Sequence, residues 1–157
     1  MRLLAVALLL GFAPLTAHAD DALNPPHPAL ARIQANLDHC TDTQPGNINE
    51  MLCAVEAYKA VDVLLNTLYG KIVAKLKQNE DPDHDLQERK ELLKRLVASE
   101  RAWIAYSETE CSHASAYMLG GSGEPTILAQ CRLSMREDRL NNLFRFYKIR
   151  YPDIAEE

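Results

Sequence analysis

The chain has 157 residues, of which 17 are Lys or Arg and 22 are Asp or Glu, so its formal net charge at pH 7 is −5. A chain of this length suits one domain and can bury a hydrophobic core. Its acidic balance argues against a nucleic acid or an anionic membrane as the partner and is compatible with a basic protein.

Residues 1–19 have the features of a signal peptide: a positive start at Arg2, an apolar stretch and small residues up to Ala19. The apolar stretch is shorter than the roughly 20 residues of a membrane-spanning helix, and no later stretch is apolar enough. We therefore expect export to the periplasm or the medium, cleavage before Asp20, and no membrane insertion afterwards. The mature chain would keep 16 basic and 22 acidic residues, a net charge of −6.

Three prolines make residues 20–28 a flexible arm, because proline lacks the backbone N–H that helices and strands use. A single helical domain is expected over residues 29–157. It begins with a short helix over residues 29–38, and a Pro-Gly pair then predicts a turn over residues 41–47.

The clearest periodic pattern follows this turn. Its apolar residues recur every three or four positions, which places them on one face of a long helix. Asn47 or Asn49 is expected to cap the start of that helix. The apolar positions are Met51, Val55, Tyr58, Val61, Leu65, Leu68, Ile72 and Leu76.

A polar segment interrupts the pattern, and Asp81 or Asp83 can cap a third helix that reaches about residue 119. The glycine-rich residues 120–125 end it, and a last amphipathic helix is expected over residues 126–147. The predicted fold is all-α: an up-and-down bundle of three long helices and one short one. The apolar residues of the third helix are Leu86, Leu93, Leu96, Val97, Trp103 and Ile104.

Four cysteines follow the signal peptide, an even number that indicates two disulfides in an exported protein. Four cysteines can form two disulfides in three different ways. The predicted helices favour Cys40 with Cys53 and Cys111 with Cys131, because each pair is close in sequence and joins neighbouring helices, but crossed pairings stay open.

Motifs for catalysis are absent from the sequence, which has no nucleophile elbow, no His-Glu-x-x-His and no phosphate-binding glycine loop. Glu110 and His113 form only one of the two Glu-x-x-His copies that a helical di-iron site needs. His27, His39 and His84 are expected to be solvated. We therefore expect no enzyme activity, no cofactor and no metal.

Two features could contact a protein partner. Trp103 and Tyr106, three positions apart, could form an exposed aromatic anchor, although core packing is the expected role of the only tryptophan. The glycines of residues 120–125 either only permit a turn or let a disulfide-pinned loop project into a partner. In the second case Ser122 and Glu124 are the candidate contact residues.

Further motif residues occur in a characteristic order between the cysteines and, for the last of them, eight residues after Cys131: Asp62, Leu65, Asn66, Tyr69, Arg101, Trp103, Ile104, Tyr106, Gly120, Gly121 and Arg139. Together with the cysteines they resemble the LprI-like family of small bacterial envelope proteins, whose founding member is described as a lysozyme inhibitor. Three positions depart from the family pattern: Glu100 replaces Gln, Ser107 replaces Arg, and Arg136 replaces Thr.

Asp62, Asn66 and Tyr69 are spaced by four and three positions, so they share a helix face and can hydrogen-bond to Arg101 or Arg139. This spacing predicts a buried polar clasp between helices. For function, the resemblance implies inhibition of a lysozyme by direct binding, and the acidic charge suits a basic lysozyme. The alternative is a non-inhibitory envelope binding or adaptor module, because a fold does not fix a function.

Overall fold

A computed structural model describes residues 25–78 and 85–155, which form an all-helical bundle with two disulfides, as predicted. The predicted signal peptide lies outside the described residues, as do Asp81, Asp83 and His84. No helix within the described ranges is long and apolar enough to cross a membrane. The elements are α2 (Ala29–Thr43), α3 (Asn47–Lys77), α4 (Leu86–Ser115), the 3-10 helix η1 (Ala116–Met118), α5 (Glu124–Tyr147) and the 3-10 helix η2 (Pro152–Ala155).

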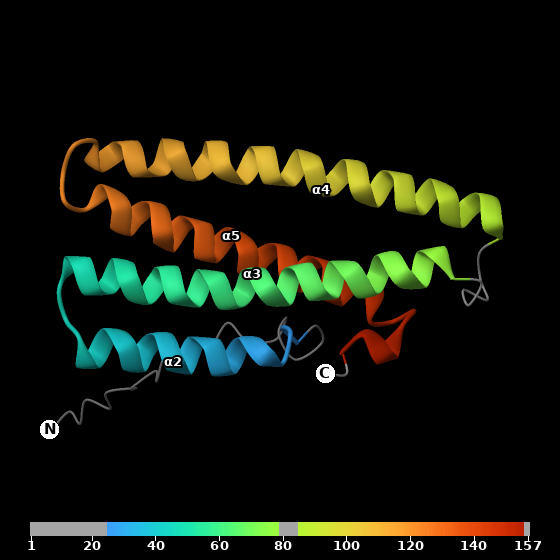
Figure 1. Cartoon of the computed structure of the whole chain (residues 1–157), viewed down its shortest axis with the longest axis horizontal. Coiled ribbons are helices and arrows are strands. Elements are labelled where there is room, and N and C mark those ends of the chain that lie inside the picture. Colours follow the sequence, from blue (N-terminus) through green and yellow to red (C-terminus); the bar gives the residue numbers. More distant parts are fainter. Residues whose placement is uncertain (1–24, 79–84, 156–157) are drawn as a thin grey trace, which may run out of the picture.

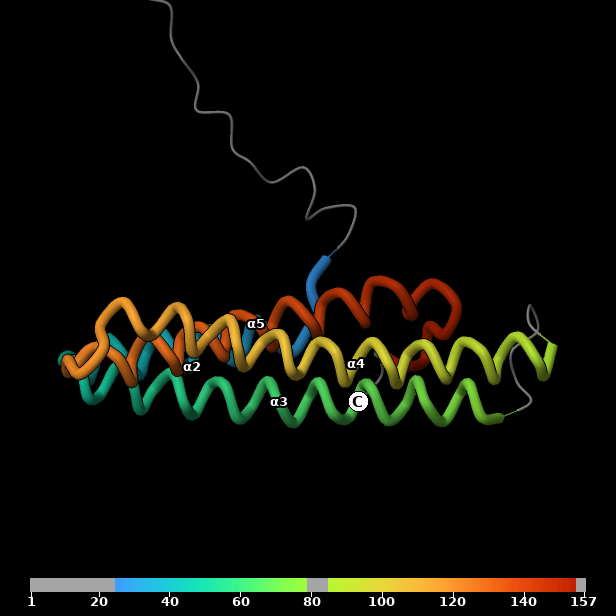
Figure 2. Tube along the Cα trace, turned by 90° about the horizontal axis from the view of Figure 1, so that it is seen from above, coloured from blue at the N-terminus to red at the C-terminus, as the bar shows by residue number. Residues whose placement is uncertain are grey.

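The helices lie along one long axis and reverse direction from each to the next (Figure 1). α2 and α3 form one hairpin, α4 and α5 form another, and α5 packs along α3. The turn between α2 and α3 and the turn between α4 and α5 lie at the same end of the molecule, as Figures 1 and 2 both show. We call this end, formed by residues 44–46 and 116–123, the hairpin end.

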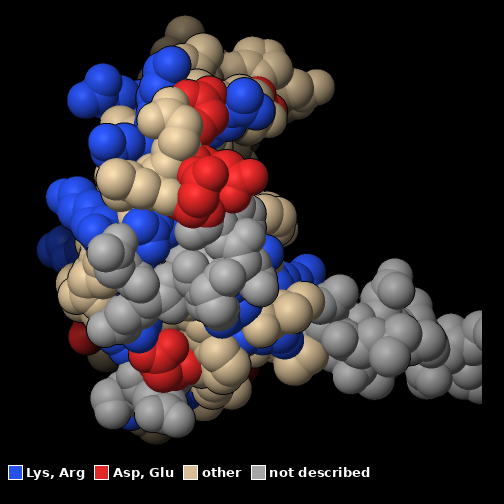
Figure 3. Space-filling view, turned by 90° about the vertical axis from the view of Figure 1, so that its right-hand side faces the viewer, with Lys and Arg blue, Asp and Glu red and all other residues tan. Residues whose placement is uncertain are grey.

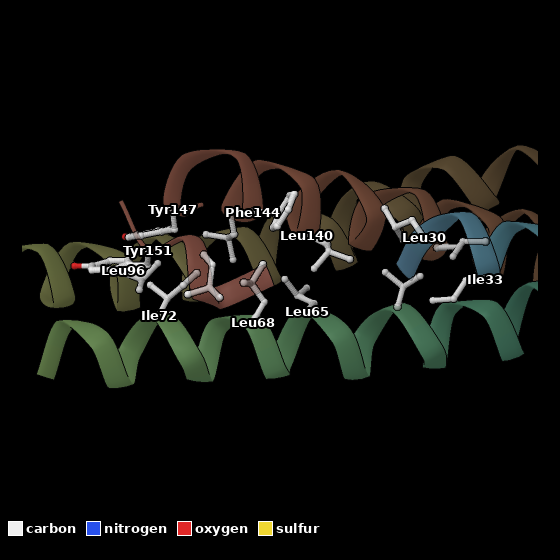
Figure 4. Packing of buried hydrophobic residues seen from close by; sticks show 14 of the residues in the cluster. Leu30, Ile33, Leu65, Leu68, Ile72, Leu96, Leu140, Phe144, Tyr147 and Tyr151 are labelled. Atoms are coloured by element: carbon white, nitrogen blue, oxygen red, sulfur yellow. The ribbon is translucent and has the colours of Figure 1, made fainter. Parts of the chain in front are cut away.

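The predicted apolar face of α3 supplies the centre of the core. Leu140 and Phe144 of α5 pack against it from one side, and Leu30 and Ile33 of α2 extend the cluster toward the hairpin end (Figure 4). The face thus joins both hairpins into one hydrophobic core. Its fully buried members are Val61, Leu65, Leu68, Ile72 and Leu76.

The start of α3 differs from the prediction. Met51, Val55 and Tyr58 are only half-buried, because near the hairpin end α3 buries small residues, among them Cys53 and Ala54, against its neighbours. The cap prediction was also wrong. Gly46, at φ +123°, precedes the first helical residue, and no side chain caps the helix.

The other helices also begin or end at residues that differ from the predicted ones. α2 continues to Thr43, through part of the expected turn, and the Thr43 hydroxyl donates to the His39 carbonyl within the last turn. α4 begins after Asp85, whose carboxylate accepts the N–H groups of Gln87 and Glu88 in a capping box. α5 begins at residue 124, two positions earlier than predicted, because a proline suits the first turn of a helix.

The apolar residues of α4 are less buried than its pattern suggested. Leu96 is buried, whereas Leu86 and Ile104 are exposed. α4 lies at the edge of the bundle, where it contacts α3 and α5 along one side only (Figure 1). An edge helix needs only a narrow apolar stripe, so part of the predicted one faces solvent.

The described part of the predicted arm, residues 25–28, packs against α5. The His27 backbone N–H donates to Asn141 Oδ1 at 2.9 Å, and the His27 ring lies 4.9 Å from the Phe144 ring. His27 is buried, so the prediction of a solvated histidine was wrong here, whereas His39 is exposed as expected.

Candidate functional site

Two disulfides tie the helices together near the hairpin end. Cys40 of α2 bonds Cys53 of α3, and Cys111 of α4 bonds Cys131 of α5, with Cα–Cα distances of 5.9 and 5.5 Å. The two preferred pairings are thus confirmed, and no cysteine remains free. Each bond stabilises one hairpin next to its turn.

Halfway along the bundle, Arg136 of α5 reaches into the space between α3 and α4. Its Nε donates to Asp62 Oδ1 at 3.1 Å, and its Nη2 donates to Tyr58 Oη and Glu108 Oε1, both at 3.3 Å. The guanidinium carbon lies 5.1 Å from the Tyr58 ring centroid and 5.0 Å from that of Trp103, within cation–π range. Arg136 is therefore a buried charge with partners on both neighbouring helices.

Arg136 also contacts the part of α4 that faces it. In the structure, Arg136 Nη1 donates to Ser107 Oγ at 3.4 Å, and both side chains are buried. The small side chain of Ser107 therefore borders the space on α4 that the guanidinium of α5 fills.

One turn further along α5, Arg139 pairs with α4. Its Nε and Nη2 donate to Glu100 Oε2 at 2.9 and 2.8 Å, and Nη2 also donates to Ser99 Oγ at 3.1 Å. The two charged side chains are 14% and 13% exposed, which makes this the most enclosed ion pair of the described residues. Trp103 lies between the two arginines, because Arg139 is 5.7 Å from its ring centroid.

The polar clasp predicted from the spacing was wrong in its partners, because a different arginine, Arg136, links α3 to α4. Asp62 binds Arg136 and not the arginines named from the spacing. Asn66 donates to Asp62 of its own helix, and Tyr69 packs against the core. Arg101 is exposed.

Trp103 and Tyr106 do not form a joint aromatic anchor. Trp103 is half-buried and packs against the core, as expected for the only tryptophan. Tyr106 is exposed. The two rings therefore lie in different surroundings although their spacing places them near one face of α4.

Glu108 links both arginines of α5 that face it. Arg132 Nη2 lies 2.6 Å from Glu108 Oε2, and Arg136 Nη2 lies 3.3 Å from the other oxygen. The hydrogen bond from the Arg132 side chain holds the pKa of Glu108 below its ordinary value of 4.5, although partial burial acts in the opposite direction. The ionised form of Glu108 therefore favours the folded state.

The sign of this shift gives a pH prediction. A carboxyl whose pKa is lower in the folded state stabilises the fold above its unfolded pKa and loses this effect as the pH falls through its folded pKa. We expect Glu108→Gln to lower the Tm at pH 7 and to approach the Tm of the unsubstituted protein as the pH falls through the lowered pKa of Glu108. Since Glu108 is 39% exposed, the effect at pH 7 should be at most about 1 kcal/mol.

Thermal unfolding followed by circular dichroism across this pH range measures the difference. Glu110→Gln is the matched control, because Glu110 is exposed and makes no ion pair with any described residue. A Tm difference for Glu108→Gln that is independent of pH would contradict the assigned role.

The turn between α4 and α5 is held by hydrogen bonds. Gly120 has φ +74°, a conformation that favours glycine, and its N–H donates to Glu124 Oε2 at 2.8 Å. The Gly121 N–H donates to the Met118 carbonyl at 2.7 Å. The carboxylate of Glu124 is thus turned back onto the loop.

The same turn is joined to the first hairpin. Thr126 Oγ1 donates to the Asn47 carbonyl at 3.1 Å, and Asn47 Nδ2 lies 3.5 Å from the oxygen of the exposed Ser122. Ser122 and Glu124, the two predicted contact residues, therefore both lie at the hairpin end. Ser122 is exposed, and Glu124 is half-buried.

Large apolar side chains are exposed at this end. Tyr117 is 93% and Leu119 77% exposed, and Met118 between them is also exposed. We call these three residues the apolar tip. Ile48 and Leu52, in the first two turns of α3, are exposed as well. Met118 packs over Gly123, whereas Tyr117 and Leu119 face solvent. Exposed apolar runs of this kind mark contact surfaces.

The half of the bundle next to the apolar tip is acidic. Residues 31–62 and 107–136, all of them described, contain eight acids and four Lys or Arg. Only two of the acids, Asp62 and Glu108, form ion pairs. The six others are Asp38, Asp42, Glu50, Glu56, Glu110 and Glu124.

Basic residues prevail in the described part of the other half, which has twelve Lys or Arg and seven acids, although residues 79–84 add three more acids. Figure 3 looks at the end opposite to the hairpin end, where Lys and Arg side chains cover much of the described surface. The charge of the bundle is therefore unevenly distributed along its axis.

Nothing in the described ranges resembles a catalytic or metal centre. No three His, Cys, Asp or Glu side chains of residues 25–78 and 85–155 come together as metal ligands do. A groove of about 380 Å³ lies between α2 and α3 beside the Cys40–Cys53 bond. Its lining mixes apolar residues such as Leu37 and Ala57 with His39 and Glu56.

Comparison with known proteins agrees with this description. The sequence model of the family described as lysozyme inhibitor LprI matches residues 40–143, from the first cysteine to the last turns of α5. An uncharacterised protein of Rhizobium meliloti (strain 1021) is 30% identical over 93 residues, which are 59% of this chain and 67% of that protein. No solved structure matches the chain. The chain therefore belongs to the LprI family of lysozyme inhibitors.

Proposed function

We propose that this protein inhibits a lysozyme by binding it directly. The observation that carries the proposal is the family match, which includes both disulfides and the Arg139–Glu100 pair. An inhibitor needs a surface for its target and no catalytic centre. A non-inhibitory binding or adaptor module of the envelope is the second candidate, because relatives can keep a scaffold and change the partner.

The proposed place of action is the periplasm or the medium. Residues 1–19 have the composition of a signal peptide. Both disulfides support the same location, because such bonds form and persist in oxidising compartments. A lysozyme that attacks the cell wall acts in those compartments too.

Charge supports a basic target. Six acids of the half next to the apolar tip lack an ion-pair partner among the described residues. Such a surface accelerates the approach of a positively charged protein and repels an acidic one. We expect the association rate with a basic lysozyme to fall on the order of tenfold when salt screens these charges.

The test is the lysis of a peptidoglycan suspension, followed as loss of turbidity, by hen-type and goose-type lysozymes. We expect the oxidised protein from residue 20 onward to slow lysis by at least one of them, with saturation near equal concentrations of inhibitor and enzyme. The same protein after reduction and alkylation is the control. If lysis by both enzymes is unaffected, the protein is a binding module of another kind.

A further inference from the structure

We infer that the apolar tip is the surface that docks into lysozyme, with Tyr117 and Leu119 as its anchors; this inference rests on the proposed function. Both side chains are almost wholly exposed, at 93% and 77%, so the bundle itself gains nothing from them. Large apolar side chains that are buried in a partner contribute strongly to affinity, and tyrosine is among the commonest residues at the centre of interfaces.

The backbone of the tip is held by hydrogen bonds and by a nearby disulfide. The Leu119 N–H donates to the Ala116 carbonyl at 3.2 Å, and the Gly121 N–H donates to the Met118 carbonyl. Below the turn, the Cys111–Cys131 bond fixes the distance between α4 and α5. A surface that is already ordered loses little conformational entropy on binding, and a tyrosine has few torsions to fix.

The charges next to the tip select the partner. Glu110 precedes it on α4, Glu124 follows it on α5, and Glu50 lies in the first turn of α3 at the same end. None of them has an ion-pair partner among the described residues. A second copy of this chain would bring the same acids face to face, which like-charge repulsion disfavours. A basic protein with an apolar cleft is the partner that fits.

The uncharged anchors also suit an enzyme whose cleft is acidic. The catalytic residues of a lysozyme are two carboxylic acids, which would repel an inserted carboxylate. Tyr117 and Leu119 carry no charge, and the carboxylate of Glu124 is held by the Gly120 N–H at 2.8 Å. Glu124 is thus a positioning residue of the loop, and the two anchors that would enter the cleft are themselves uncharged.

The experiment compares two double variants in binding titrations against hen-type and goose-type lysozymes. Tyr117→Ala with Leu119→Ser removes the anchors. Phe146→Ala with Ile149→Ser is the matched control, because these side chains are 70% and 81% exposed but lie at the C-terminal end of α5. We expect the tip variant to lose about thirtyfold or more in affinity and the control to stay within about twofold.

The outcomes separate this inference from the proposed function. If the unsubstituted protein binds and the tip variant binds as tightly, or if the control loses as much affinity, the inference is wrong and the function stands. If the unsubstituted protein binds neither lysozyme, both are wrong. Light scattering gives a further test. If the unsubstituted protein is a dimer and the tip substitutions make it a monomer, the inference is wrong, because a second copy then covers the tip. Circular dichroism and the absence of free thiols verify that both variants are folded.

Discussion

Reduction of both disulfides is expected to bring the protein to the edge of unfolding. The cysteines of the two bonds are 13 and 20 residues apart. On the loop-entropy account, bonds that close loops of this size each stabilise a fold by about 3 kcal/mol. Their sum of about 6 kcal/mol is comparable to the whole stability of many domains, which is roughly 5 to 15 kcal/mol.

Urea unfolding followed by helical circular dichroism, with and without a phosphine reductant, measures this effect. The variants Cys40→Ser with Cys53→Ser and Cys111→Ser with Cys131→Ser separate the two contributions, which we expect to be equal within about 1 kcal/mol. A midpoint that stays unchanged on reduction would show that helix packing alone sustains the bundle. The variant that lacks the Cys111–Cys131 bond should also weaken lysozyme binding, because this bond lies next to the apolar tip.

The parts of the fold that depend on local spacing could be predicted from the sequence. The stripe through Val61, Leu65 and Ile72 repeats at helical intervals, and each disulfide joins residues that are near in sequence. Such features need no knowledge of how the helices are rotated against one another. This is why the bundle and both cysteine pairings were correct.

The partners of the polar residues depend on the arrangement in space. Asp62 was expected to bind an arginine of the motif, but it binds Arg136. Arg139, three positions further along the same face of α5, binds Glu100 instead. The axial position of α5 along α3 decides which of them meets Asp62, and no local spacing encodes that position. The shared face of the two arginines was the available signal for Arg136.

Exposure of apolar residues was the least predictable feature. A pattern of apolar residues predicts burial, and Tyr117 and Leu119 were read as the end of the third helix. Whether a neighbour covers them depends on where the chain turns, and here η1 and Gly120 turn it back before any element reaches them. His27 shows the converse, since α5 covers a segment that composition alone marks as an exposed arm.

Arg139→Ala is expected to lower the free energy of unfolding by about 3 to 5 kcal/mol. The substitution leaves the carboxylate of Glu100 in a site where its side chain is only 13% exposed, without the two hydrogen bonds and the positive charge that now compensate it. An unpaired charge in such a site is far more costly than the pair itself is favourable. The same substitution also removes the contact between the guanidinium and the Trp103 ring.

The matched variant removes both charges. Arg139→Met with Glu100→Leu keeps most of the side-chain volume and leaves no carboxylate to compensate, so we expect it to cost no more than about 1 kcal/mol. Urea unfolding of the double variant and of each single variant gives the coupling energy of the pair. If the double variant is as unstable as Arg139→Ala, the loss comes from packing around Trp103 rather than from the stranded charge. A small loss for Arg139→Ala would mean that water reaches Glu100 once the arginine is gone.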